Sequence, residues 1–178
     1  MPRLFTGLEV PSSIRQLLSL KQSGLPDIRW VDPSDFHITL RFIGDVEPRI
    51  ANDIVEELSR RSWPAPQISV GELKCFGGSK PTALYAEVKP NEELSNIAAT
   101  QERLMQQLGL PADSRRFTPH ITLGRCKKVS ADNIARYLSD QGSVPTELTY
   151  RPNRLVLYSA RESRGGGPYQ IEQSWPFS

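Results

Sequence analysis

The stretches His37-Ile-Thr-Leu40 and His120-Ile-Thr-Leu123 are the same tetrapeptide, and they hold the only two histidines of the chain. Self-similarity within one chain is a sign of internal repetition. A helical pattern of apolar residues begins a few residues after each tetrapeptide. The sequence therefore predicts two related halves, each with a motif-bearing strand followed by a helix.

Each tetrapeptide reads as part of a β-strand, in which alternate side chains share a face. His37 and Thr39 then point to one side, and Ile38 and Leu40 anchor the strand in a core. The second motif repeats this arrangement. A pseudo-two-fold relation between the two strands would bring both His–Thr pairs to one site. The alternative is that these are ordinary polar residues on a solvated strand face.

The rest of the chain predicts many strands and few helices. We expect eight or nine strands and four helices that do not strictly alternate, which favours an α+β fold with antiparallel sheets. The expected strands are 4–10, 28–31, 36–44, 68–76, 83–88, 117–125, 148–151, 154–158 and 169–173; the expected helices are 14–24, 47–61, 91–108 and 130–138.

Length and composition fit a globular protein of one domain or two fused lobes. The chain has 178 residues, of which 38% are hydrophobic and 24% charged, with a net charge of +2. No apolar run approaches the ~20 residues that span a bilayer. The N-terminal residues do not resemble a secretory signal. Cys75 and Cys126 are far apart, so we expect reduced thiols, no zinc ribbon and a cytoplasmic location.

Positive charge is concentrated in one part of the chain. Residues 1–89 hold 11 basic and 11 acidic side chains, whereas residues 115–164 hold ten basic and four acidic ones, a balance of +6. A solvated basic surface is one reading of this segment. Attraction of a phosphate-bearing ligand is the other.

Two histidines in a duplicated motif suit paired acid–base catalysis. The reference pKa of imidazole is ~6.5, so near neutral pH one ring can accept a proton while the other donates one. The threonine hydroxyls can hold phosphate oxygens on which charge builds. Two histidines without a third nearby ligand make a poor zinc site, so we expect neither a metal nor another cofactor.

At these motifs the chain resembles the 2H phosphoesterase superfamily, which is defined by two His-x-Thr/Ser-x motifs. It is most similar to the LigT-like RNA 2′,3′-cyclic phosphodiesterases, also called 2′-5′ RNA ligases. The stretches 3–10, 36–44 and 117–125 carry that similarity. The resemblance implies a single domain over residues 1–178, built from two intertwined, pseudo-symmetric lobes of antiparallel sheet with outer helices around a central cleft.

The same resemblance implies an activity and its residues. The activity is hydrolysis of RNA 2′,3′-cyclic phosphate ends to 2′-phosphomonoesters, in some members with reversible 2′-5′ ligation. His37 would be the proton donor and His120 the proton acceptor, with Thr39 and Thr122 holding the phosphate. The implied partner is RNA with a cyclic phosphate end, and we expect a monomer.

Further side chains are candidates for substrate contact. Arg125 follows the second motif and is suited to phosphate or base. Phe42 and Trp30 could stack on a base or pack in the core. Tyr158 and Tyr169 flank the glycine-rich segment 161–168, which reads as a flexible loop.

Two other functions compete with the leading hypothesis. One is a phosphodiesterase for 2′-5′ oligonucleotides or small cyclic nucleotides. The other is a non-catalytic RNA-binding module that uses the same cleft. The positive segment favours a longer RNA, because several phosphates would meet several cations.

Overall fold

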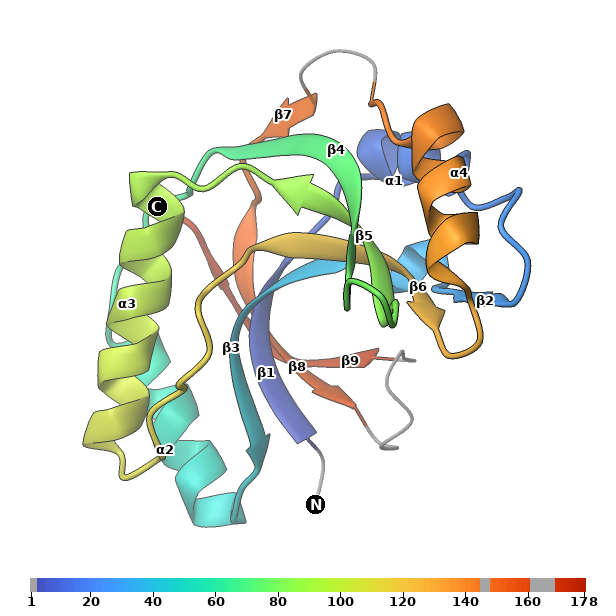
Figure 1. Ribbon diagram of the computed structural model, residues 1–178. Coiled ribbons are helices and arrows are strands. Elements are labelled where there is room, and N and C mark those ends of the chain that lie inside the picture. The colour runs from blue at the N-terminus through green and yellow to red at the C-terminus, as the bar shows by residue number, and fades with distance from the viewer. Residues whose placement is uncertain (1–2, 145–147, 161–168) are drawn as a thin grey trace.

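The computed structural model describes residues 3–144, 148–160 and 169–178. Within them lie nine strands, four α-helices and one 3-10 turn, which confirms the predicted α+β class (Figure 1). The strands are β1 (Arg3–Glu9), β2 (Ile28–Trp30), β3 (His37–Asp45), β4 (Ile68–Phe76), β5 (Ala83–Val88), β6 (His120–Cys126), β7 (Leu148–Tyr150), β8 (Arg154–Ala160) and β9 (Tyr169–Pro176); the helices are α1 (Ser12–Ser19), α2 (Pro48–Ser59), α3 (Glu92–Gln107) and α4 (Ala131–Gln141), and the 3-10 turn is η1 (Pro33–Asp35).

All strands pair antiparallel, in the order β7-β4-β5-β6-β3-β1-β8-β9, with β2 on the edge of β6. The two motif strands β3 and β6 meet in the middle of this order through a single residue pair, Ile38 with Ile121. Neighbouring strand pairs share many more residues, such as β1 with β3. The sheet therefore consists of two halves that touch at the centre of the two motifs.

The order of elements along the chain explains the symmetry of the sheet. The run β1-α1-β3-α2-β4 is followed by β5-α3-β6-α4-β8, with the motif strand in the same place each time. In the sheet, β4 pairs with β5 and β8 pairs with β1. The last strand of each run therefore pairs within the half of the sheet that the other run forms. The motif strands lie next to the pseudo-two-fold axis.

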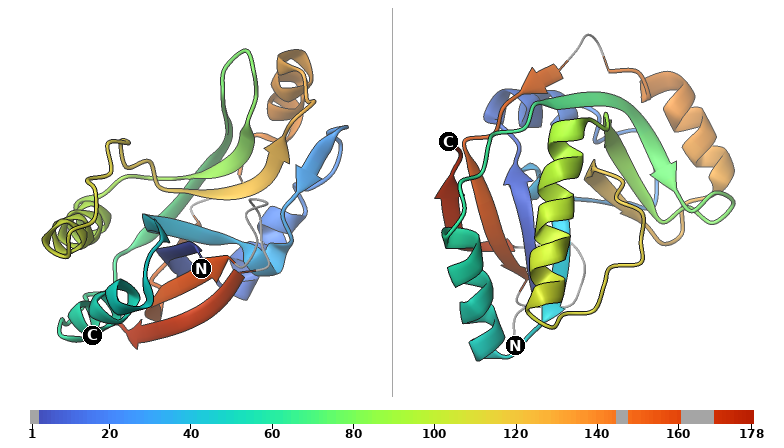
Figure 2. Two further views of the ribbon diagram at one scale, coloured as in Figure 1. Left: turned by 90° about the horizontal axis from the view of Figure 1, so that it is seen from below. Right: turned by 90° about the vertical axis from the view of Figure 1, so that its left-hand side faces the viewer.

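The helices lie outside the strands, α2 and α3 along one side of the molecule and α1 and α4 along another (Figures 1 and 2). Each helix buries an apolar stripe in one continuous core, which burial of apolar area stabilises. The stripes include Ile14 and Leu18, Ile54 and Leu58, Leu94 and Leu104, and Ile134 and Tyr137. No helix in the described ranges is long and apolar enough to cross a bilayer.

Several predicted boundaries differ from the structure by three residues or more, and two of them have a local reason. The helix expected over 14–24 ends at Ser19, because the chain turns there and the Gln22 amide donates to the carbonyls of Val31 and Leu123 at 2.7 and 3.1 Å. The strand expected from residue 117 begins at His120. Proline has no N–H to donate to a strand ladder, and Pro119 comes directly before it.

Candidate active site

The same hydrogen bond orients both histidine rings. Nδ1 of His37 donates to the Asp35 carbonyl at 2.8 Å, and Nδ1 of His120 donates to the Thr118 carbonyl at 2.6 Å. Since a carbonyl oxygen can only accept, the proton of each neutral ring sits on Nδ1. Nε2 of each neutral ring therefore carries a lone pair that can accept a proton.

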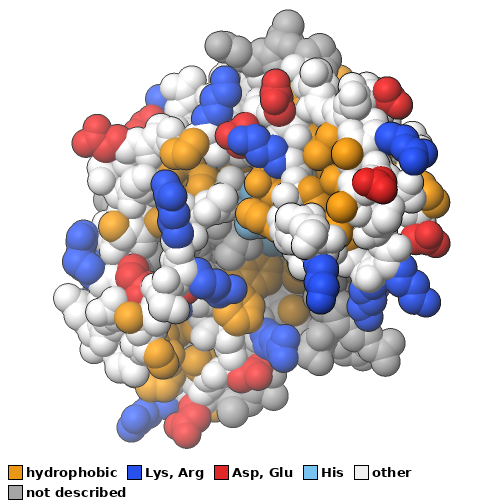
Figure 3. Space-filling model, in the orientation of Figure 1, with side chains coloured by type: hydrophobic (Ala, Val, Ile, Leu, Met, Phe, Trp, Pro, Cys, Tyr) orange, Lys and Arg blue, Asp and Glu red, His pale blue; other side chains and the backbone are white. Residues whose placement is uncertain are grey.

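Both His–Thr pairs face the same side of the sheet. Because Ile38 and Ile121 pair directly and are fully buried, the residues on either side of each point away from the core. Nε2 of His37 lies 3.1 Å from Oγ1 of Thr39. Histidine surface lies at the bottom of a hollow, with Lys and Arg side chains around it (Figure 3). The structure thus places the four predicted residues, Thr122 included, on one face.

A β-bulge follows the threonine in each motif strand. The pairing of β3 with β1 skips Leu40, and the pairing of β6 with β5 skips Leu123. An extra residue in one strand shifts the alternation of its side chains. The third residue after each threonine therefore returns to the histidine face. These residues are Phe42, which is 41% exposed, and Arg125, which is half-buried.

Three aromatic rings surround His37. The ring centroids lie 5.0 Å away for Phe5, 5.7 Å for Tyr158 and 4.9 Å for Tyr169. Phe5 also stacks on Tyr158 at 5.0 Å. These rings come from three strands of one half of the sheet, and they hold the imidazole in a largely apolar setting.

Two aromatic rings contact His120. Phe76 of β4 lies 4.9 Å away and Tyr85 of β5 lies 5.3 Å away, both with their planes steeply inclined to the imidazole. Phe76 and Tyr85 stack on each other at 4.0 Å. This aromatic pair corresponds to the stack beside His37, but a third ring is not among the contacts of His120 in the described residues.

Burial lowers the pKa of both histidines, since it disfavours the charged form. For His37 the pKa falls to about 4, chiefly through desolvation, although the bond to the Asp35 carbonyl opposes the shift. Positive charge on His120 and Arg125 lowers it further. The pKa of His120 is lowered less, by burial and by the charge on Arg125. His120 and Arg125 therefore lie close enough to His37 to act on its charge.

Arg125 differs from Arg41, the first residue after the other motif. Arg41 is buried, and its guanidinium binds the Glu102 carboxylate at 2.5 Å and the Pro111 carbonyl at 2.8 Å. Arg125 has no hydrogen-bond or ion-pair partner within the described ranges, and its buried Nε is unpaired. A half-buried cation without a carboxylate favours an anionic ligand.

The remaining candidates separate into two groups. Tyr158 and Tyr169 lie against His37, so they belong to the site. Trp30 instead lies 6.2 Å from Tyr137 of α4, on the packed side of β2. The segment 161–168 falls outside the described residues. Sequence reasoning missed Phe5 and Tyr85, for which the only signal was their place on strands that pair with the motif strands, and Phe76, which lies one strand further out on β4.

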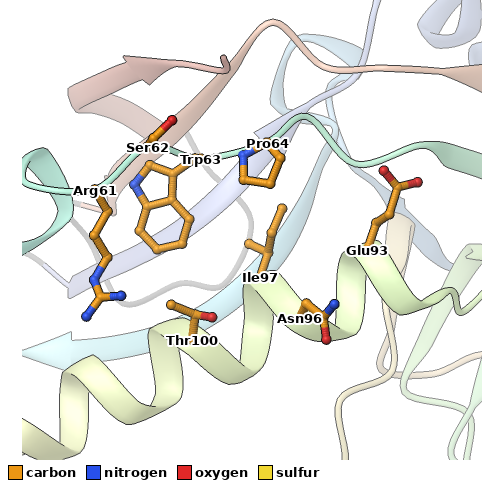
Figure 4. A pocket seen from close by; sticks show the side chains of 8 residues that line it. All are labelled: Arg61, Ser62, Trp63, Pro64, Glu93, Asn96, Ile97 and Thr100. Atoms are coloured by element: carbon orange, nitrogen blue, oxygen red, sulfur yellow. The ribbon is translucent and has the colours of Figure 1, made fainter.

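Two cavities lie apart from the histidine face. A cavity of about 420 Å³ lies between Trp63-Pro64 and α3 (Figure 4), and Glu93 in its wall is ion-paired with Arg151 at 3.1 Å. A second one, of about 220 Å³, lies beside α1 and includes Leu17 and Lys21. Neither is lined by a histidine. In the described ranges no three His, Cys, Asp or Glu side chains gather in a way that could hold a metal ion.

The fold, with one His-x-Thr strand in each half, is that of the 2H phosphoesterases. Solved structures support this at the level of the fold. Escherichia coli LigT in complex with 3′-AMP matches with a TM-score of 0.80 at 21% identity, covering 100% of this chain and 99% of that one. The protein TT0787 of Thermus thermophilus matches with a TM-score of 0.82 at 19% identity, covering 98% and 97%.

Sequence relatives narrow the class. The family model of the 2′-5′ RNA ligase superfamily matches residues 13–164. A protein of Archaeoglobus fulgidus named RNA 2′,3′-cyclic phosphodiesterase is 32% identical over 87% of this chain and 92% of its own length. One of the same name from Aquifex aeolicus is 32% identical over 94% and 89%. The chain belongs to the 2′-5′ RNA ligase superfamily.

Proposed function

We propose that this protein hydrolyses RNA 2′,3′-cyclic phosphate ends to 2′-phosphomonoesters by paired-histidine acid–base catalysis. The observation that carries the proposal is the pair of histidines on one face, each with Nδ1 bound to a carbonyl, so that Nε2 is the nitrogen available for proton transfer. Several relatives are named RNA 2′,3′-cyclic phosphodiesterase, and the LigT structure contains a nucleotide.

In the proposed reaction, the Nε2 of His120 takes a proton from water as the water oxygen attacks phosphorus. The bond from phosphorus to the 3′-oxygen breaks, and the protonated Nε2 of His37 gives its proton to that oxygen. The phosphate stays on the 2′-oxygen. A 5′-hydroxyl in place of water would give a 2′-5′ linkage by the same steps, and the reverse steps would cleave that linkage.

The electrostatics support this division of roles. The ring with the lower pKa, His37, is the stronger acid once protonated, and His120 is the stronger base. In the free site, burial disfavours the protonated form of both rings. A bound phosphodiester anion next to both rings raises their pKa values and increases the charged fraction.

The other side chains on this face hold the substrate in our proposal. Hydroxyls of Thr39 and Thr122 donate to the non-bridging phosphate oxygens, where charge increases in the transition state. Arg125 binds the phosphate or base of the terminal nucleotide, and Phe42 stacks on a base. The protein acts as a monomer, without a metal ion.

The direct test is turnover of an RNA oligonucleotide with a 2′,3′-cyclic phosphate end, in the presence of EDTA, with the position of the product phosphate determined by NMR. We expect a 2′-phosphate and a rate unaffected by the chelator. A 3′-phosphate product would show that the 2′-oxygen, and not the 3′-oxygen, is the leaving group. A folded protein that binds this end without turnover would favour the binding module, and cleavage of 2′-5′ linked oligonucleotides alone would favour the rival phosphodiesterase.

A further inference from the structure

Strand β2 places a second arginine beside Arg125. In the pairing of β2 with β6, Arg29 lies directly opposite Arg125. On the same two strands, Ile28 and Trp30 cover Gly124 closely enough that a Cβ there would lie 2.5 Å from the Ile28 side chain. Since Ile28 and Trp30 cover one face, Arg29 points to the other. That face is the one on which Arg125 approaches the histidines.

Two like charges directly opposite each other destabilise a strand pair unless something offsets the repulsion. Neither guanidinium has a hydrogen bond or ion pair with another side chain in residues 3–144, 148–160 and 169–178, and Nε of Arg125 is buried and unpaired. Lys127 and Lys128 follow directly after β6 and add further positive charge. Asp27, two residues before Arg29, is the carboxylate nearest in sequence to these four basic residues. The local charge favours an anion bound between the two arginines.

The shape of an RNA end indicates which anion this is. The cyclic phosphate is the 3′ terminus, so the chain leaves the terminal nucleoside only through its 5′-oxygen, as a phosphodiester. Arg125 is half-buried beside the histidines and Arg29 is exposed next to it, at the rim. The two arginines therefore lie in a row that leads outward from the histidine site, along a path that an RNA strand leaving the site could follow.

We propose that Arg29, with Arg125, binds the phosphodiester that joins the terminal nucleotide to the rest of the RNA. This proposal rests on the proposed function, and it makes Arg29 a specificity-determining residue. A 2′,3′-cyclic mononucleotide lacks this phosphate. The protein then prefers RNA ends over cyclic mononucleotides, and Arg29 supplies part of that preference.

The test compares kcat/KM on two substrates, an oligonucleotide with a 2′,3′-cyclic end and a 2′,3′-cyclic mononucleotide. Arg29→Gln is expected to lose about tenfold on the oligonucleotide, as for one charged hydrogen bond, and less than about twofold on the mononucleotide. Arg29→Lys retains the charge and most of the rate. Arg49→Gln, an exposed arginine of α2, is the matched control and changes neither.

Salt dependence gives a second readout. For single-stranded RNA each phosphate contact contributes about 0.7 to the slope of log affinity against log salt, so Arg29→Gln should lower the slope for a 2′-phosphate-ended oligonucleotide by about that amount. An equal loss on both substrates, or an unchanged slope, would overturn the proposal. Absence of turnover by the wild type on both substrates would refute the proposed function, while the binding slopes would still decide the role of Arg29.

Discussion

The half that contains His37 and the half that contains His120 use the same backbone device with different surroundings. In both strands the carbonyl two residues before the histidine accepts a hydrogen bond from the imidazole, and a β-bulge follows the threonine. Among the residues that the structure describes, His37 lies among three aromatic rings, whereas His120 contacts two. The residue that returns to the histidine face beyond the bulge is Phe42 in one half and Arg125 in the other. Duplication supplies two equivalent positions, and the neighbours make them unequal.

Removal of either imidazole should have the largest effect. His37→Ala and His120→Ala should each lower kcat by about 10³-fold or more, since general acid–base groups contribute ~10²–10⁴-fold. The double variant should be little worse than either single one, because the two groups act in one step. The measurement is single-turnover cleavage, with thermal unfolding to confirm the fold. A variant that kept a tenth of the rate would break the claim that both halves are needed.

The threonines should matter next. Thr39→Val and Thr122→Val remove one hydroxyl each from the proposed phosphate site, and a loss of about 10- to 100-fold in kcat is expected for one donor to a developing charge. Serine variants, which keep the hydroxyl, are the controls. If valine and serine variants were equally active, neither threonine would hold the phosphate.

A smaller effect should distinguish Arg125 from Phe42. Arg125→Gln removes a charge that lowers the pKa of both histidines. The pH profile of kcat/KM, which reports the free enzyme, should therefore shift to higher pH, with about a tenfold loss in rate. Phe42→Leu should change the rate without moving the profile. A shift in the Phe42 variant, or none in the Arg125 variant, would contradict this contrast.

The smallest effect concerns stability. The pKa of His37 in the folded protein, about 4, lies below the ~6.5 of an unfolded chain. Between these values the unfolded state binds more protons, so the free energy of unfolding should fall as pH falls from about 6.5 to 4. His37→Gln should reduce that slope, by less than about 1.4 kcal/mol per pH unit. His120→Gln should reduce it less; denaturant unfolding across this pH range measures both.

Local signals predicted most of the fold and the centre of the site. The duplicated tetrapeptide and its alternation indicated His37, Thr39, His120 and Thr122, because a strand places alternate residues on one face whatever its partner. The exchange of β4 and β8 between the halves gave no local signal, since it depends on the pairing of distant segments. The bulges that bring Phe42 and Arg125 onto the histidine face appear only in the register of paired strands.

The central claim is that the histidines of two equivalent strands have opposite roles, one as proton donor and the other as proton acceptor. A change of the leaving group tests this claim most directly. A cyclic end with sulfur in place of the 3′-bridging oxygen expels a thiolate, which needs no proton. His37→Ala should then recover most of its lost rate relative to the wild type, and His120→Ala should recover none. Recovery by the His120 variant would reverse the roles, and recovery by neither would contradict the account of His37 as the proton donor.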